Sequence, residues 1–152
     1  MPAIGPGPHR AALYPTPGMF AVRADSRSRS IADLRDRPVV WNSCGSGLAV
    51  QGRYVVDGLG LDAEKDFEPT YTERLAEGPQ MVLDDRAAAL WGGGLRWPGF
   101  VTIASNARGA RFVVPDATES SRIMAKHRFL RRFTVPAGTY SGQSDPIESV
   151  GS

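Results

Sequence analysis

The fold is decided by residues 38–60, which read PVVWNSCGSGLAVQGRYVVDGLG. The apolar start of this stretch, Pro38–Trp41, predicts a short buried strand. A glycine–serine turn, Asn42–Gly47, follows it directly. The next residues share one helical face: Leu48, Gln51, Val55 and Leu59. A strand, a turn and a helix in this order form the unit from which α/β binding sites are built, so the stretch predicts an α/β fold.

Short apolar runs alternate with helical patterns along the rest of the chain. Strands are predicted at 19–22, 67–72, 87–91, 111–114 and 133–135. Helices are predicted at 77–84, 98–107 and 118–130, and a short one follows a capping box formed by Ser30 and Asp33. This alternation predicts a three-layer α/β domain with a mostly parallel sheet. Residues 1–18 are rich in proline and predict a lead-in without a packing face, which leaves residues 19–152 as a single domain.

The composition excludes several classes of protein. Of the 152 residues, 41% are hydrophobic and 22% are charged, which is typical of a globular domain, and the net charge is only +2. One cysteine and two histidines exclude a disulfide framework and a Cys/His zinc module. No apolar run approaches the roughly 18–20 residues that cross a bilayer. The basic residues are scattered except at Lys126–Arg132, interpreted as an exposed helix face, so no nucleic-acid partner is expected.

The Asn42–Gly47 turn carries the strongest chemical signal. Its glycines allow several amide N–H groups to point at one place, and the helix behind adds its positive end, which favours a carboxylate or a phosphate. Ser43 and Ser46 add hydroxyl donors. The alternative is that the glycines only permit a tight turn and that Ser46 only caps the helix. The turn is neither a Walker A loop nor a dinucleotide fingerprint, and neither a cofactor nor a metal is predicted.

Cys44 is a candidate nucleophile because a helix N-terminus favours the thiolate. A catalytic thiol usually also needs a base, and the two histidines, His9 and His127, lie in the lead-in and in the basic helix. The favoured interpretation of Cys44 is a small buried residue. The sequence therefore predicts no catalytic residue.

A second loop, Trp91–Pro98, follows a predicted strand and reads WGGGLRWP. Its two tryptophans, Trp91 and Trp97, are candidate walls of a pocket, and Arg96 is suited to pair with a carboxylate. The alternative is a hinge loop whose aromatic rings only pack. Because parallel strands end at one edge of a sheet, this loop and the Asn42–Gly47 turn are expected to lie together there.

Four stretches, in this order, resemble a known family of proteins. They are residues 30–40, residues 44–48 with the helix end at 59–61, residues 87–94 with Pro98, and residues 125–143, AKHRFLRRFTVPAGTYSGQ. The last is similar to the ending "Y-x-x-x-x-I-P-A-G-T-Y-P-G-Q", typical of the TAXI family of solute receptors for TRAP-type transporters. The resemblance covers roughly residues 13–150 and implies one lobe of the type II periplasmic-binding-protein fold.

The resemblance implies a binding protein rather than an enzyme. Such receptors capture a small organic acid or amino acid between two lobes in the periplasm and pass it to a TRAP-type membrane permease. The predicted ligand-binding residues are Asn42, Ser43, Gly45, Ser46, Gly47, Trp91, Gly93, Gly94, Arg96 and Tyr140. Tyr140 enters this set because it follows the proline–alanine–glycine turn.

The family chain is about twice as long, so this chain is expected to be a fragment that covers mainly the second lobe. It carries no secretory signal, so as given it is expected in the cytoplasm, whereas the resemblance implies the periplasm. Two alternative functions stay open. One is a truncated lobe that binds nothing and self-associates through exposed apolar surface. The other is an acyl-transfer enzyme that depends on Cys44.

Overall fold

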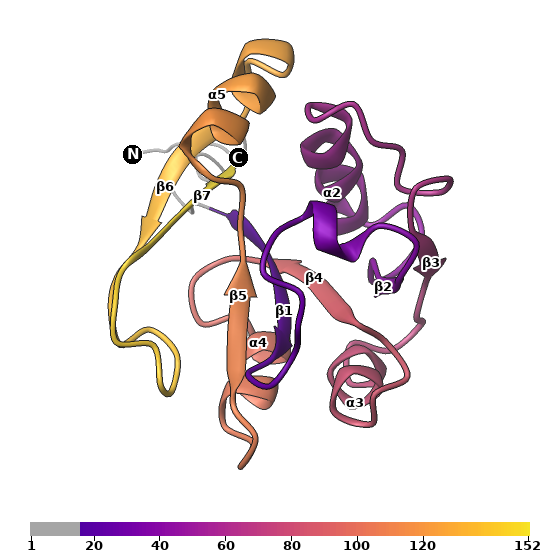
Figure 1. Ribbon diagram of the computed structural model, residues 1–152, viewed down its shortest axis with the longest axis vertical. Coiled ribbons are helices and arrows are strands. Elements are labelled where there is room, and N and C mark those ends of the chain that lie inside the picture. The colour runs from indigo at the N-terminus through magenta and orange to yellow at the C-terminus, as the bar shows by residue number, and fades with distance from the viewer. Residues whose placement is uncertain (1–15) are drawn as a thin grey trace, which may run out of the picture.

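The computed structural model describes residues 16–152, which fold into a seven-stranded sheet with helices on both faces (Figure 1). The elements in chain order are β1 (Pro17–Arg23), the 3-10 helix η1 (Ala32–Leu34), β2 (Pro38–Val40), α2 (Gly47–Asp57), β3 (Glu68–Thr70), α3 (Glu77–Leu83), β4 (Ala89–Gly93), α4 (Pro98–Ala104), β5 (Ala110–Val113), α5 (Ala117–Lys126), β6 (Arg131–Val135) and β7 (Ile147–Gly151). The α/β class predicted from the sequence is confirmed.

Most strands run in one direction, as predicted, but few of them are parallel neighbours. The order is β3-β2-β4-β1-β7-β6, and β5 also pairs with β1. β2 pairs in parallel with β3 and with β4. β1 runs against β4, β5 and β7, and β6 runs against β7. The five strands β2, β3, β4, β5 and β7 therefore share a direction that β1 and β6 oppose. No pattern in the sequence predicts that β1 is inserted between strands of the opposite direction.

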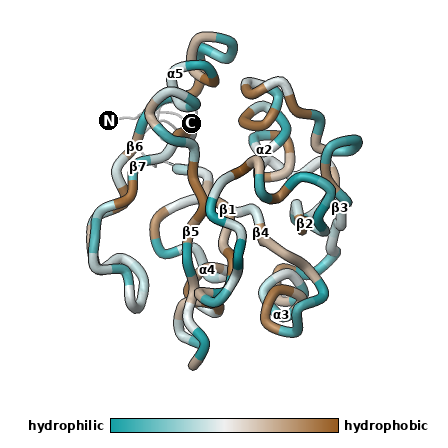
Figure 2. Tube along the Cα trace, viewed as in Figure 1, coloured by the Kyte–Doolittle hydropathy of each residue, from teal (hydrophilic) through white to brown (hydrophobic). Residues whose placement is uncertain are grey.

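Alternating side chains divide the core into two layers, one on each face of the sheet. On β1, Phe20 and Val22 belong to the cluster under α2, α5 and η1, whereas Met19 and Ala21 belong to the cluster under α3 and α4. All four are fully buried. The domain therefore has three layers, helices, sheet and helices, as expected. Figure 2 shows that hydrophilic residues concentrate on the connecting loops.

Several boundaries differ from the predictions. Residues 1–15 of the predicted lead-in lie outside the described residues, but Pro17 and Gly18 are buried in β1, so the domain begins before residue 19. β7 was not predicted. The predicted strand at 87–91 runs instead from 89 to 93. Gly92 and Gly93 continue it because they pair with Met19 and Gly18 of β1. Residue 92 is glycine because a Cβ there would collide with the ring of Trp97.

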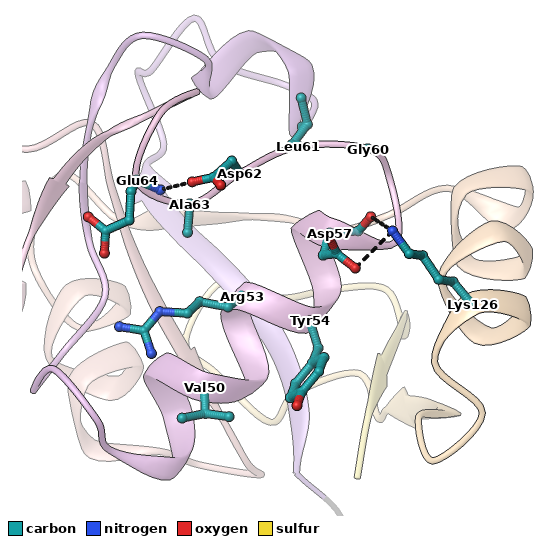
Figure 3. Close-up of a pocket in the computed structure, with 10 residues that line it drawn as sticks. All are labelled: Val50, Arg53, Tyr54, Asp57, Gly60, Leu61, Asp62, Ala63, Glu64 and Lys126. Carbon is teal, nitrogen blue, oxygen red and sulfur yellow. Dashed lines mark hydrogen bonds and ion pairs between the residues drawn. The ribbon is translucent and has the colours of Figure 1, made fainter.

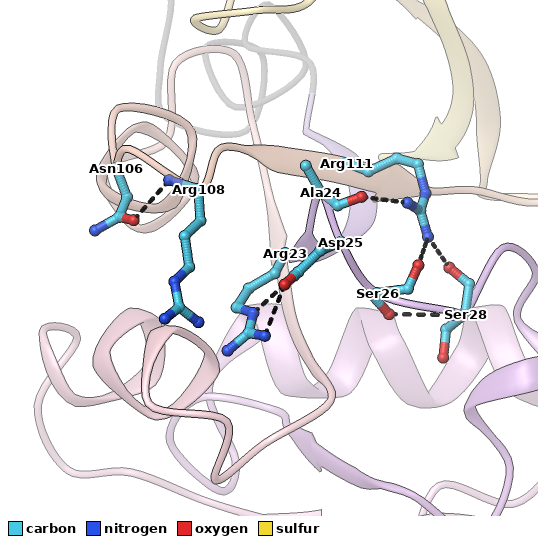
Figure 4. Close-up of polar contacts among 8 residues, drawn as sticks. All are labelled: Arg23, Ala24, Asp25, Ser26, Ser28, Asn106, Arg108 and Arg111. Atoms are coloured by element: carbon cyan, nitrogen blue, oxygen red, sulfur yellow. Dashed lines mark hydrogen bonds and ion pairs between the residues drawn. The ribbon is translucent and has the colours of Figure 1, made fainter.

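At the edge where β1 ends, one arginine holds the following loop in place. Arg111 on β5 donates hydrogen bonds to the carbonyl oxygens of Ala24, Ser26 and Ser28 (Figure 4). Desolvation lowers the pKa of Arg111. Nearby, Arg23 forms two 2.9 Å hydrogen bonds with the carboxylate of Asp25.

The first and last described residues lie side by side. The amide of Thr16 donates to the carbonyl oxygen of Ser152 at 3.0 Å, and β1 pairs with β7 at Pro17 and Gly151. Gln51 on α2 also donates its side-chain amide to the Thr16 carbonyl, at 2.9 Å. Both ends of the described chain therefore lie at the edge of the sheet where β2 and β4 end.

Candidate functional site

The Asn42–Gly47 turn and the loop after β4 meet at one edge of the sheet, as the sequence predicts. β2 lies between β3 and β4 and is parallel to both, so all three carboxyl ends share this edge. The side-chain amide of Asn42 donates to the carbonyl oxygen of Trp91, two residues before the end of β4. On the other side, the Ser43 hydroxyl donates to the carbonyl oxygen of Thr72, at 3.0 Å, just after β3. Ligands of open α/β sheets bind at this kind of edge.

The turn itself is tight and depends on two residues with positive φ. Asn42 has a φ of 72° and Gly45 a φ of 85°, the left-handed region that asparagine and glycine adopt more readily than other residues. The Ser46 amide donates to the Ser43 carbonyl at 3.0 Å, which closes the turn. Ser46 is the N-cap of α2, and its hydroxyl accepts from the Ala49 amide at 3.1 Å. The capping role for Ser46 is therefore confirmed.

Capping leaves other amides of the turn free. Within residues 16–152 no partner is found for the backbone N–H groups of Cys44, Gly45 and Gly47, and all three residues are exposed. The Oδ1 atom of Asn42 is buried and also has no partner in this part of the chain. These amides stand where the positive end of the α2 dipole is strongest, so the turn can receive an anionic oxygen.

Arg53, which is not among the residues predicted from the sequence, adds a positive charge beside the turn. From α2, its Nη2 atom lies 3.7 Å from Cys44 Sγ and 3.3 Å from the Tyr71 hydroxyl. The Tyr71 hydroxyl donates to a carboxylate oxygen of Glu64. Burial, reinforced by Glu64, raises the pKa of Tyr71. No motif marks Arg53, because only the fold places its side chain near the turn.

The predicted site residues of the β4–α4 loop divide into exposed and covered ones. Gly94, with a φ of 105°, is half-buried, and open space lies beside it. Arg96 is exposed, and its Nη1 atom lies 3.5 Å from the Thr139 carbonyl oxygen. Gly93 is buried, and a Cβ there would press on Thr16, Pro17 and Leu48, so this glycine serves packing.

Two predicted binding residues are core residues instead. Trp91 is 1% exposed and donates its indole N–H to the Leu48 carbonyl at 2.7 Å, so it does not form the wall of an open pocket. Tyr140 is 3% exposed, and burial raises its pKa. Its hydroxyl donates to the Gly94 carbonyl and accepts from the Trp97 amide. Tyr140 therefore fixes the loop rather than facing a ligand, and Trp97, half-buried against Gly92, also packs.

Two cavities on the surface of residues 16–152 are lined by residues other than those of the Asn42–Gly47 turn. One is a groove of about 740 Å³ on the outer face of α2, lined by Val50, Arg53, Tyr54, Asp57, Gly60, Leu61, Asp62, Ala63, Glu64 and Lys126 (Figure 3). The other, of about 180 Å³, lies at the opposite edge of the sheet, where Arg23, Asp25 and Asp85 line it. The candidate site lies outside both of these cavities, and Cys44, Gly45 and Gly47 of its turn are exposed.

Cys44 is exposed, so its interpretation as a small buried residue is wrong. Its geometry nevertheless gives no nucleophile–base pair with His127. The imidazole Nε2 of His127 lies 2.7 Å from an Asp57 carboxylate oxygen, at the far end of α2. Eleven helical residues separate the two ends of α2, a distance of about 16 Å.

No cluster of three or more His, Cys, Asp or Glu side chains suited to a metal ion is found in residues 16–152. In the same region no helix is both long and apolar enough to span a bilayer.

The fold and the site define a three-layer α/β domain whose parallel strands end at an edge formed in part by a turn with exposed backbone amides. Residues 11–152 match the NMT1-like family, and the chain belongs to that family.

Three solved structures are similar to this chain. The first is the substrate binding protein of an amino acid ABC transporter, with 9% identity, a TM-score of 0.48, and coverage of 97% of this chain and 53% of that one. The second is the probable amino-acid ABC transporter extracellular-binding protein ytmK from Bacillus subtilis. It has 19% identity and a TM-score of 0.46, and the match covers 66% of this chain and 41% of that one. The third is the arginine-specific periplasmic binding protein STM4351 from Salmonella typhimurium. It has 15% identity and a TM-score of 0.48, and the match covers 66% of this chain and 39% of that one.

All three similar structures are of binding proteins. This chain spans about half the length of the first of them, and less of the other two. At these identities and TM-scores the likeness does not extend to ligand or mechanism.

Proposed function

We propose that this chain is a lobe of the solute-binding component of a transport system and that it binds a small organic acid or amino acid at the Asn42–Gly47 turn. The observation that carries the proposal is the set of exposed amides at Cys44, Gly45 and Gly47, which have no partner in residues 16–152. These amides lie at the N-terminus of α2, where backbone donors and the helix dipole together favour a carboxylate.

Charged and polar side chains next to the turn also favour a ligand that carries an anionic group. Arg53 lies beside the turn, and Arg96 is exposed on the adjoining loop. Ser46 accepts a hydrogen bond from the helix, so its hydroxyl hydrogen stays available for a ligand oxygen. The proposed contacts are therefore the Cys44, Gly45 and Gly47 amides, the Ser46 hydroxyl and the Arg96 guanidinium, with Asn42, Ser43 and Gly94 shaping the backbone around them.

We further propose that the transporter is of the TRAP type and that the receptor belongs to its TAXI class and works in the periplasm. The ending of residues 125–143 supports this class. A gene for a large fused TRAP permease beside the gene for this chain is the expected finding. A neighbouring pair of ABC permease and ATPase genes would contradict it.

Isothermal titration of the chain tests the binding proposal. The panel contains glutamate, aspartate, glutamine, arginine, succinate and 2-oxoglutarate. We expect saturable heat with at least one carboxylate and none with the matching amide or amine that lacks the carboxylate. Silence across the whole panel would count against a solute-binding role for this lobe.

A further inference from the structure

One segment of the chain gathers positive charge that the proposed solute site does not use. Residues 122–132 contain five basic residues, Arg122, Lys126, Arg128, Arg131 and Arg132, and no carboxylate occurs between Glu119 and Asp145. The sequence analysis interpreted the cluster as one helix face. In the structure it runs from the last residue of α5, through a turn, into the edge strand β6.

Three of these cations are exposed and unpaired. No hydrogen bond or ion pair is found for the side chains of Arg128, Arg131 and Arg132 within the described chain, whereas Lys126 lies 3.0 Å from a carboxylate oxygen of Asp57. Arg122 reaches only the Leu59 carbonyl, at 3.4 Å. The unpaired guanidinium groups therefore keep their capacity to bind an external anion.

An aromatic residue stands in the middle of the unpaired arginines. Phe129 is 51% exposed, and its ring lies 5.1 Å, edge to face, from the ring of Tyr54, which is itself 40% exposed. The next residue, Leu130, is 3% exposed, so it anchors the turn in the core while Phe129 stays outside. Figure 1 shows the end of α5 and the turn into β6 at the top of the view, at one end of the long axis of the molecule.

We propose that Arg128 and Phe129 of this turn, together with Arg131 and Arg132 at the start of β6, form a docking surface for an anionic phospholipid membrane. Guanidinium groups bind phosphate oxygens in a bidentate manner. Aromatic rings flanked by cations settle at the level of the lipid headgroups. A projecting turn can meet a flat lipid surface without a complementary cavity. The surface lies at the far side of α2 from the Asn42–Gly47 turn, so the inference is independent of the proposed solute site.

Vesicle co-sedimentation of the whole chain tests the proposal. The vesicles contain phosphatidylcholine alone or with about one third phosphatidylglycerol, at low salt. We expect binding to the anionic vesicles only, and its loss at high salt. Each arginine near such a surface contributes roughly fivefold to the affinity, so the triple variant Arg128→Gln, Arg131→Gln, Arg132→Gln should bind about 100-fold more weakly.

A matched control separates a local surface from net charge. Arg27, Arg29 and Arg37 are also exposed, and their side chains have no partner in the described residues. The triple variant Arg27→Gln, Arg29→Gln, Arg37→Gln removes the same charge elsewhere and should lose less than about fivefold. Equal losses in the two triple variants would overturn the proposal, and so would an absence of binding to anionic vesicles.

Phe129→Ser tests the aromatic contribution. We expect binding to anionic vesicles to weaken at least threefold, with an unchanged dependence on salt because the charges remain. A far-ultraviolet circular dichroism spectrum identical to that of the parent chain verifies that the variant is folded. A folded Phe129→Ser variant with unchanged affinity would remove the ring from the docking surface and overturn that part of the proposal.

Discussion

Replacing Gly47 by proline removes one amide donor from the proposed anion site while leaving the helix intact. Gly47 is the first residue of α2, a position where proline is favoured because its amide has no partner inside the helix. Ser46 precedes it with a ψ of 158°, the extended conformation that a residue before proline adopts. Nothing lies within 4 Å of a Cβ built at Gly47, so a side chain fits.

The size of the effect follows from the loss of one hydrogen bond to a charged group. Such a bond contributes about 1.5–3 kcal/mol, so the Kd for the tightest carboxylate of the panel should rise by roughly 10–150-fold. The free energy of unfolding should stay constant or rise by about 0.4–1 kcal/mol, because proline restricts the unfolded chain. Binding would thus weaken without any loss of stability.

Isothermal titration and urea unfolding of two variants measure both quantities. Gly47→Ala is the matched control, since it adds a Cβ in the same open space but keeps the amide. We expect its Kd to stay within about threefold of that of the parent chain. If Gly47→Pro and Gly47→Ala bind the carboxylate equally well, the Gly47 amide does not contact the ligand, and our argument for the turn is wrong.

Three further outcomes are expected, each measured by urea unfolding. Tyr140→Phe should lower the free energy of unfolding by about 1–3 kcal/mol, because the Gly94 carbonyl and the Trp97 amide lose their shared partner; an unchanged value would contradict the fixing role of Tyr140. Arg111→Met should cost a similar amount, about 1–3 kcal/mol, since three backbone carbonyls lose a charged donor, and a neutral result would show that water replaces it. Hydrogen bonds from Lys126 and His127 lower the pKa of Asp57, so the contribution of this carboxylate to folding stability is present above its unfolded-state pKa and is lost as the pH falls through its folded-state pKa. Asp57→Asn should therefore flatten the decline in the free energy of unfolding below about pH 4. Parallel pH profiles of the variant and the parent chain would refute this.

The parts of the fold that depend on local sequence were predictable. The Ser30–Asp33 capping box forms as expected, with Asp33 accepting from the Ser30 amide and Ser30 accepting from the Asp33 amide. The β2–turn–α2 unit also forms where its pattern predicts. In each case neighbouring residues in the chain supply both partners of the interaction, so the sequence contains the necessary information.

Features that depend on distant partners were not predictable. β7 was missed because Ile147–Gly151 contains a glutamate and a serine and has no strong alternation, and it forms only because β1 and β6 are available to pair with it. Trp91 next to glycines resembles a binding loop, yet the packing of α2 over β4 covers it. Arg53 became a candidate for the site only when the fold placed it near Cys44.

The hydrogen bond between Thr16 and Ser152 makes these two residues neighbours on antiparallel strands. The hydrogen bonds of such a pair lie perpendicular to the strands. A tension applied between Thr16 and Ser152 therefore points along these bonds and breaks them one after another. Stretched in this way by an optical trap, the domain should come apart at low force even if it resists urea well. Stretched between Arg23 and Ser152, which lie at opposite ends of the paired strands β1 and β7, the same bonds are loaded together in shear, and the domain should hold to a higher force.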